Sequence, residues 1–159
     1  MELNIREAVV SDYDDLCKLF DEGDALHREN IPSVFRESKG PARYEEYILG
    51  LVSDEDVGLF VARVGSQTVG LVCVIVRESP AVPIFVPRRY AEVDNLVVKE
   101  AFRQAGIGRA LMEKAHEWIQ AKGLDSVELN VYEFNRAAIE FYQNLGYETA
   151  SRRMSRQLS

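Results

Sequence analysis

The stretch of sequence that decides the fold is LVVKEAFRQAGIGR, residues 96–109. It begins with apolar residues typical of a strand, passes through a short polar connection and reaches two glycines one residue apart, where a helical pattern starts. The start of a helix presents unpaired N–H groups and a partial positive charge, and glycine lets a phosphate approach without a Cβ in the way. Arg103 and Arg109 add positive charge on either side. The stretch therefore predicts an anion cradle occupied by pyrophosphate, unless the glycines serve only close packing of the helix on the strand.

Two other glycine motifs for phosphate binding are excluded by single positions. The dinucleotide fingerprint needs a third glycine where the chain has Leu111, so a nicotinamide site is not predicted. A Walker loop needs Gly-Lys before Ser or Thr, whereas Gly108 is followed by Arg109. A flavodoxin-like domain would need a doubly wound order, but the middle of the chain is predicted to form strand hairpins.

Outside this stretch, the apolar pattern alternates between strand-like and helical periods. The predicted strands cover residues 3–9, 59–64, 68–76, 90–98, 126–132 and 147–154, the last as an edge strand. The predicted helices cover residues 11–26, 41–51, 106–122 and 135–146. Gly65 and Ser66 join the second and third strands as a hairpin. No repeat or linker divides the chain, so the order β-α-α-β-β-β-α-β-α-β predicts one mixed α/β domain over residues 1–159, with helices covering the sheet.

Two blocks of the sequence resemble the GCN5-related N-acetyltransferase (GNAT) family. The block RQAGIG, residues 103–108, resembles the family's R/Q-x-x-G-x-G/A signature. The block ELNVYEFNRAAIEFYQNLGY, residues 128–147, is similar to its second landmark. The resemblance is close over roughly residues 90–148, whereas the preceding part agrees only in the order of its elements. It implies a GNAT-like, mixed and mostly antiparallel six- to seven-stranded sheet flanked by about four helices.

The same resemblance implies an enzyme, an acetyl-CoA-dependent N-acyltransferase. Acetyl-CoA would be the cosubstrate, and its acetyl group would pass to a primary amine by direct attack in a ternary complex, without a covalent enzyme intermediate. Cys17 and Cys73 agree with direct transfer, because neither has a nearby histidine in the sequence or a helix-start setting that would activate a thiol. The alternative is a non-catalytic acetyl-CoA-binding sensor or interaction module with the same fold.

The resemblance also implies where the cosubstrate would bind. The pantetheine arm lies along the strand before the glycine turn in this family, which points to Leu96, Val97 and Val98. Unpaired strand N–H and C=O groups are suitable partners for its amides. The pyrophosphate would lie beside Arg103 on the N–H groups of Gln104, Ala105, Gly106, Ile107, Gly108 and Arg109. Asn135 matches a position whose side chain contacts the cofactor, although an asparagine there is also a good helix N-cap.

Tyr142 matches the general acid of the family, which protonates the departing thiolate. A phenol suits this role because its pKa of about 10 is near that of an alkyl thiol; without the motif, Tyr142 would be taken for a core aromatic. Glu92 matches the glutamate base of the histone-acetylating branch, or it is only a solvated strand carboxylate. Asp94 shares a strand face with Glu92 by alternation, and many members of the family use waters instead. Glu92, Asp94 and a water therefore stay open as the base.

The charge of the chain is unevenly distributed. Residues 1–56 carry 15 acidic and 6 basic side chains, and residues 57–159 carry 11 acidic and 13 basic ones, within a net charge of −7. Nucleic acid is not predicted as a partner, because a phosphate backbone calls for a basic stripe. The acidic N-terminal third favours a cationic amine as the acceptor, unless its acids only form the solvated faces of two helices.

The resemblance implies that one wall of the acceptor groove lies over about residues 25–43, in the part of the family that varies with substrate. Basic residues there and in the later proline-rich connection could instead receive a carboxylate. They are Arg28, Arg36, Lys39, Arg88 and Arg89. The sign of the acceptor's charge therefore stays open between a cationic amine and a carboxylate-bearing one.

Composition addresses location and partners. No apolar run approaches the ~20 residues of a membrane helix, and the N-terminus lacks the basic start and apolar stretch of a signal peptide. Two cysteines without a CxxC or Cys/His cluster predict neither a disulfide framework nor a metal site, and they favour a cytoplasmic location. Exposed edge strands at the C-terminus would allow a homodimer.

Overall fold

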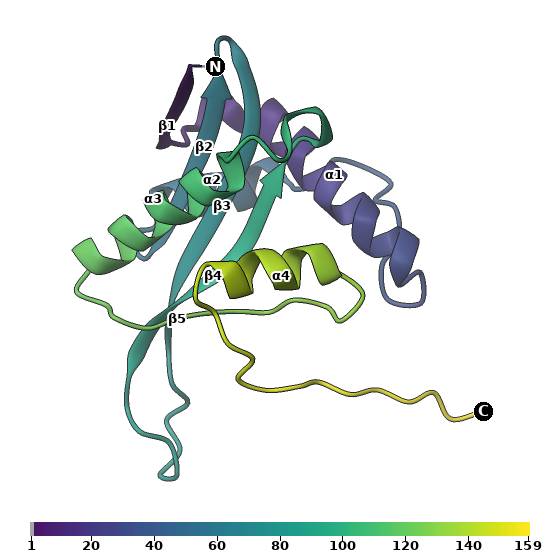
Figure 1. Ribbon diagram of the computed structural model, residues 1–159, viewed down its shortest axis with the longest axis vertical. Helices are drawn as coiled ribbons and strands as arrows, with labels where there is room; N and C mark the ends of the chain where they lie inside the picture. The colour runs from purple at the N-terminus through teal and green to yellow at the C-terminus, as the bar shows by residue number, and fades with distance from the viewer. Residues whose placement is uncertain (1) are drawn as a thin grey trace. The chain divides into compact units, whose positions relative to one another are not determined.

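The computed structural model describes residues 2–159, and its tertiary contacts divide the chain after Leu129 into two units (Figure 1). The first unit holds the sheet and three of the α-helices, and the second holds the remaining helix and the C-terminal segment. Each unit is described separately. The single domain expected over residues 1–159 stays a prediction.

A five-stranded sheet forms the centre of the first unit. Its strands are β1 (Leu3–Glu7), β2 (Val57–Val64), β3 (Gln67–Glu78), β4 (Arg89–Val98) and β5 (Val127–Leu129). They lie side by side in chain order; β1 to β4 are antiparallel, and β5 is parallel to β4. The predicted mixed, mostly antiparallel sheet is confirmed, with five strands in the described chain in place of six or seven.

The described chain contains four α-helices, the number predicted. They are α1 (Tyr13–Asn30), α2 (Glu45–Ser53) and α3 (Ile107–Ala121) in the first unit and α4 (Arg136–Asn144) in the second. Two short 3₁₀ helices, η1 (Val10–Asp12) and η2 (Glu100–Phe102), precede α1 and α3. α1 continues beyond the predicted end at Leu26, because the N–H of Ile31 still bonds to the carbonyl of His27 and only then does Pro32 follow.

α2 begins at Glu45, later than the predicted start at Pro41. Tyr44 is its N-cap and has an extended backbone, with φ −71° and ψ 150°. The carbonyl of the preceding residue, Arg43, accepts a hydrogen bond from the hydroxyl of Tyr13, 2.6 Å away. This bond to α1 holds the segment before α2 in a non-helical conformation.

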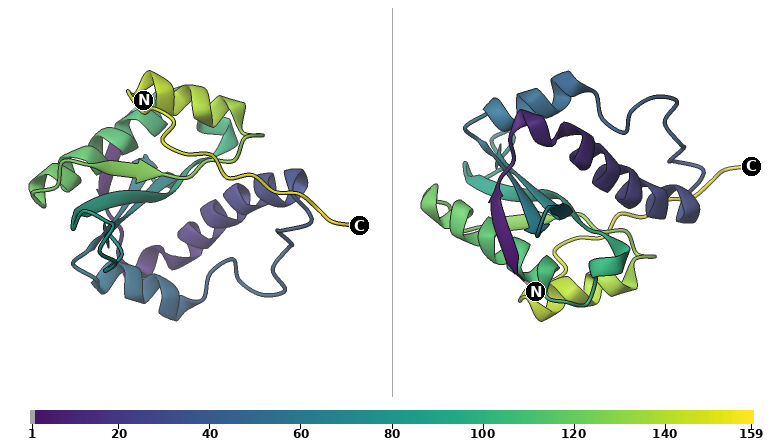
Figure 2. Two further views of the ribbon diagram at one scale, coloured as in Figure 1. Left: turned by 90° about the horizontal axis from the view of Figure 1, so that it is seen from below. Right: turned by 90° about the horizontal axis from the view of Figure 1, so that it is seen from above.

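Helices cover both faces of the sheet: α1 and α2 lie on one face and α3 on the other (Figure 2). Because strand side chains alternate between faces, each face buries its own apolar layer. The layer under α1 and α2 is built from Leu16, Leu19, Phe20, Ile48, Leu51, Leu59, Val61, Leu71, Cys73 and Val97. On the opposite face, α3 buries Ile107, Leu111, Met112, Ala115 and Ile119.

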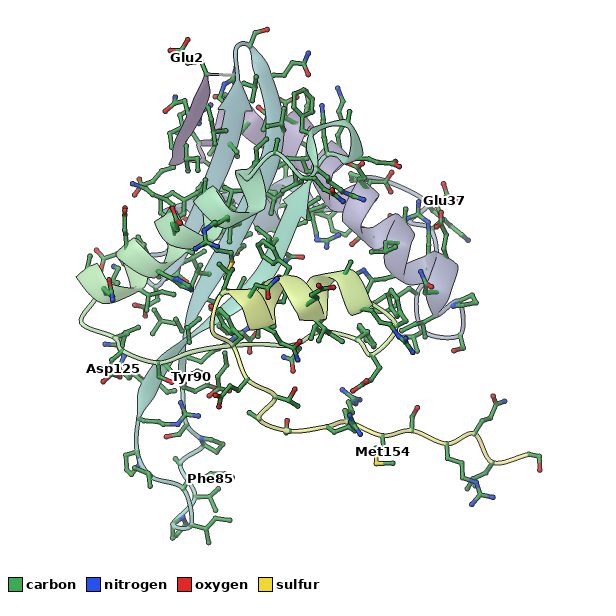
Figure 3. The ribbon with its side chains drawn as sticks, viewed as in Figure 1. Glu2, Glu37, Phe85, Tyr90, Asp125 and Met154 are labelled. Atoms are coloured by element: carbon green, nitrogen blue, oxygen red, sulfur yellow. The ribbon has the colours of Figure 1, made fainter. Side chains whose placement is uncertain are left out.

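The connection between β3 and β4 carries the exposed apolar side chains of the first unit's long hairpin. It contains Pro80, Pro83 and Pro87, and Ile84 is 84% exposed. Phe85 lies at its far end, away from the helices of the first unit (Figure 3). This connection lines a cavity of about 710 Å³.

The C-terminal strand predicted over residues 147–154 is wrong. No helix or strand follows α4 in the described chain, and residues 148–159 are exposed. A strand needs a neighbouring strand edge to pair its backbone groups. The weak alternation of this polar segment gives it no apolar face that would hold it against such an edge. The predicted homodimer therefore loses this strand as its basis and stays a prediction.

Candidate active site

β4 separates from β5 at the middle of its length. The two parallel strands pair only along Ala91–Val93, opposite Val127–Leu129. On its other edge β4 stays paired with β3 as far as Val98. Of the described strands, none pairs with residues 94–98 on the β5 side. This half of β4 is therefore an open sheet edge with unpaired backbone groups.

A β-bulge lies where the two strands separate. Val74 lies opposite Val93, and the next residue of β3, Cys73, lies opposite Asn95, so that Asp94 is the extra residue on β4. Bulges bend a strand and redirect side chains, and they are frequent beside active sites. The position of Asp94 therefore depends on this irregularity as well as on the simple alternation of the strand.

The register determines which backbone groups of β4 reach the open edge. Lys99 donates its N–H to the carbonyl of Val69, 2.8 Å away, and so faces β3. Alternation then turns the N–H and C=O groups of Val97 toward β3 and those of Leu96 and Val98 toward the open edge. Of the three predicted pantetheine contacts, only Leu96 and Val98 present backbone groups there.

The predicted anion cradle, the N–H groups of residues 104–109, lies at the start of α3. None of these N–H groups donates a hydrogen bond to another described residue. Gly106 is the N-cap, with φ 83° and ψ 4°, a left-handed conformation that strains other residues. Gln104 also has a positive φ of 60°, uncommon for a residue with a side chain. The turn therefore has the unpaired donors and the special backbone of an anion site.

Both arginines beside the anion cradle have carboxylate neighbours. Arg103 donates from Nε to the carbonyl of Val98 at 3.0 Å, and its Nη2 lies 3.9 Å from Oε1 of Glu22. Arg109 pairs with Glu113 at 3.2 Å, and both side chains are 62% exposed. Their positive charge is partly balanced, which leaves the backbone N–H groups as the main attraction for an anion.

The two candidate bases lie on the face covered by α1 and α2. Glu92 is opposite Ile75 and lies 3.4 Å from Nη2 of Arg77, so it is paired with a cation. Burial, and after it the charge of Asp94, raises the pKa of Tyr47 on α2. The same two causes raise the pKa of the buried Cys73 thiol to about 12, which makes this thiol inert.

An ion pair beside these carboxylates was not predicted from the sequence. The guanidinium of Arg43 makes two hydrogen bonds to the carboxylate of Asp24, at 2.8 and 3.2 Å, and lies 4.5 Å from the ring centroid of Phe20. Nineteen positions separate Arg43 from Asp24, so no local pattern announces the pair.

Three of the basic residues proposed to receive a carboxylate are already paired. Arg28 lies 3.4 Å from Asp21, and Arg88 lies 2.6 Å from Glu128. Arg89 is 3.4 Å from Asp56. By contrast, Asp94 is exposed and forms no ion pair within the described chain; its carboxylate accepts a hydrogen bond from the neutral amide of Asn95, 3.0 Å away.

The second unit holds the two remaining predicted residues. Asn135 is the N-cap of α4, and its side-chain oxygen accepts a hydrogen bond from the N–H of Ala138 at 3.2 Å. Burial raises the pKa of Tyr142 to about 12. Its ring contacts Phe141 and Tyr147 edge-on, with centroids 5.3 and 5.7 Å away. The phenol is therefore protonated throughout the neutral pH range.

In residues 2–159, His, Cys, Asp and Glu side chains form no group of three arranged to hold a metal ion. The same residues contain no helix long and apolar enough to cross a membrane.

Known proteins resemble the chain in sequence and in fold. The profile of the acetyltransferase (GNAT) family matches residues 22–147. An uncharacterised N-acetyltransferase of Methanocaldococcus jannaschii is 32% identical over 144 residues, which are 91% of this chain and 60% of that protein; the chain thus spans less than two thirds of this relative. The Escherichia coli ribosomal protein bS18-alanine N-acetyltransferase is 33% identical over 61 residues, 38% of this chain and 41% of that protein. A solved tetramutant of a Bacillus halodurans protein has a TM-score of 0.91 at 27% identity, covering 98% of this chain and 99% of its own.

Proposed function

Because the chain belongs to the acetyltransferase (GNAT) family, we propose that it transfers the acetyl group of acetyl-CoA to a primary amine. One observation carries the proposal: the open edge of β4 leads directly into the anion cradle. Strand amides followed by helix N–H groups match the order of groups in a pantetheine arm joined to a pyrophosphate. The same succession supports acetyl-CoA as the cosubstrate.

The binding roles divide between the two parts of this path. Leu96 presents its N–H and C=O groups and Val98 its N–H group for the pantetheine amides, because the register turns them toward the open edge. The Val98 carbonyl already accepts a hydrogen bond from Arg103 Nε. The unpaired N–H groups of residues 104–109 receive the pyrophosphate. Asn135 uses its side-chain oxygen for the helix cap, so a contact with the cofactor falls to its amide nitrogen.

The chemistry is direct transfer in a ternary complex. The amine loses a proton to Glu92, to Asp94 or to a water, and its nitrogen attacks the thioester carbonyl. A C–N bond forms, the nitrogen releases its second proton to solvent, and the C–S bond breaks. The departing thiolate takes a proton from the phenol of Tyr142, which regains one from solvent. The raised pKa of Tyr142 keeps its proton available.

The acceptor is a cationic amine. Asp94 is an exposed carboxylate without an ion pair in the described chain, whereas Arg28, Arg88 and Arg89 are engaged by acids. A positively charged group is therefore favoured near β4 and a carboxylate is not. The Escherichia coli relative, which carries an alanine of a ribosomal protein in its name, makes a protein amine one member of this class to test.

The test is release of free CoA thiol from acetyl-CoA with a panel of amines. The panel contains a polyamine, an aminoglycoside, a lysine peptide and a peptide with N-terminal alanine, each beside an amine of similar size that carries carboxylates. Turnover with a cationic member supports the proposal. Turnover only with the carboxylate-bearing amines would show that the acceptor class is wrong. Binding of acetyl-CoA without turnover of any amine would replace the enzyme with the sensor.

A further inference from the structure

α1 passes close to β4 at a glycine. A Cβ added to Gly23 would lie only 3.0 Å from Cγ2 of Val97, so a side chain at this position would push the helix away from the strand. The close approach brings the preceding residue of α1, Glu22, beside the turn that leads from β4 to the anion cradle. α1, whose buried side chains pack on the sheet, thereby also contacts the proposed cosubstrate site.

One carboxylate oxygen of Glu22 contacts both ends of the η2 turn. Oε1 accepts a hydrogen bond from the N–H of Glu100 at 3.0 Å and lies 3.9 Å from Nη2 of Arg103. Arg103 in turn donates Nε to the carbonyl of Val98 at 3.0 Å. The side chain of Glu22 is 32% exposed and that of Arg103 is 49% exposed, so water only partly screens these contacts.

We propose that Glu22 is a positioning residue for acetyl-CoA, which holds the η2 turn so that the anion cradle keeps its shape; this inference rests on the proposed function. The segment needs such support because it has left the sheet and includes Gln104 and Gly106 at positive φ. No ladder of regular hydrogen bonds restrains residues 103–106. The bond from Glu100 to Glu22 fixes the turn at its first residue, and Arg103 fixes it at its end.

Two substitutions of Glu22 distinguish a positioning role from a carboxylate that only repels the anion. A carboxylate near a pyrophosphate site disfavours the anion, so a bystander Glu22 would weaken acetyl-CoA binding. Removing only the charge, as in Glu22→Gln, keeps an oxygen for the N–H of Glu100. Keeping the charge but shortening the side chain, as in Glu22→Asp, withdraws that oxygen. Positioning therefore predicts weaker binding by Glu22→Asp and near-native binding by Glu22→Gln. Simple electrostatics predicts native binding by Glu22→Asp and tighter binding by Glu22→Gln.

The experiment measures acetyl-CoA binding by calorimetry and the steady-state constants of the same proteins. Positioning predicts that Glu22→Asp raises the Kd and the KM for acetyl-CoA about 10-fold, with kcat and the KM for the amine unchanged, and that Glu22→Gln stays within about 2-fold of the native Kd. The matched control is Asp21→Asn, which removes the neighbouring carboxylate of α1 and its pair with Arg28 but leaves the native acetyl-CoA affinity. Melting temperatures close to native exclude a general loss of structure.

A native Kd in Glu22→Asp would overturn the inference alone. Tighter binding by Glu22→Gln beside that result would show that the carboxylate acts only through its charge. A native chain that does not bind acetyl-CoA at all overturns the proposed function as well. Because binding is measured without turnover, the two failures are distinguishable.

Discussion

Leu129 of β5 lies opposite Val93 of β4, and it is the last pair that these two strands make in the described chain. The bulge at Asp94 follows at the next position. β4 keeps its bonds to β3 as far as Val98, so the strand stays in place although its other edge is open. A rigid strand with one unpaired edge is a suitable template for an extended, amide-bearing ligand. The same point of the sheet thus ends its own pairing and begins the proposed cosubstrate site.

Replacement of Tyr142 by Phe tests the general acid. We expect Tyr142→Phe to lower kcat by about 10²-fold or more, the scale of a lost proton donor, while the Kd for acetyl-CoA stays native. Since burial raises the pKa of Tyr142 to about 12, ionisation of this phenol should not lower the native rate between pH 7 and 10. Thiol release measured across this pH range checks both expectations.

Tyr147→Phe is the matched control for that experiment. Tyr147 contacts the ring of Tyr142, and burial raises its pKa to about 12 as well. We expect this variant to keep kcat within a few-fold of native. Equal losses in both variants would point to packing of the aromatic cluster, and a loss only in Tyr147→Phe would move the acid to that residue.

Substitutions of Glu92 and Asp94 on β4 should have different kinetic effects. If Glu92 is the base, Glu92→Gln lowers kcat by about 10²-fold or more. If Asp94 attracts the cationic amine, Asp94→Asn raises the KM of the amine several-fold with little change in kcat, and salt diminishes the difference. Amine titrations at low and high salt distinguish these roles. A large fall of kcat in Asp94→Asn alone would make Asp94 the base.

Gly106 should affect both stability and cosubstrate binding. A Cβ at Gly106 meets nothing within 4 Å, but the φ of 83° is strained for alanine. We expect Gly106→Ala to lower the free energy of unfolding by about 1–2 kcal/mol and to raise the Kd for acetyl-CoA. Gly65→Ala is the control, because Gly65 in the β2–β3 turn has a φ of 61° and equally open space. It should lose similar stability with native affinity; unchanged affinity in both variants would argue against the anion cradle.

Asp12 should control the acid stability of the first unit. Its carboxylate is 5% exposed and makes two hydrogen bonds of 2.8 Å to Arg6, which lowers its pKa. The unfolded chain then binds more protons than the native one at acid pH, so this stabilisation is present above the unfolded pKa and disappears as the pH falls through the lower native pKa. We expect Asp12→Asn to lose about 2 kcal/mol at pH 7.

Urea unfolding at pH 7 and near pH 3 checks the expectation for Asp12. The difference between the native chain and Asp12→Asn should shrink at the lower pH. Asp125→Asn, which removes an exposed carboxylate, serves as the control and should match the native chain at both pH values. A constant difference across the two pH values would show that the pair with Arg6 is not the source of the stabilisation.

The elements predicted best from sequence are those that local residues specify. Gly65 and Ser66 close the β2–β3 hairpin as expected, and the apolar positions of α3 from Ile107 to Ile119 form its buried side. The expected strand over residues 147–154 failed because a strand also needs an edge to pair with, which its own sequence cannot provide. The sequence likewise placed Val97 among the pantetheine contacts, although the register turns its backbone groups toward β3.

The sequence by itself determined the family, the order of elements as far as α4 and the glycine turn, because helix starts, hairpin turns and apolar periods depend on neighbours a few positions away. Only the tertiary structure decided the bulge at Asp94, the pair of Arg43 with Asp24 and the contact of Glu22 with Glu100. These features join segments up to 78 positions apart. Their geometry follows from strand register and from the close passage of α1 at Gly23, which exist only after the sheet and its helices have packed together.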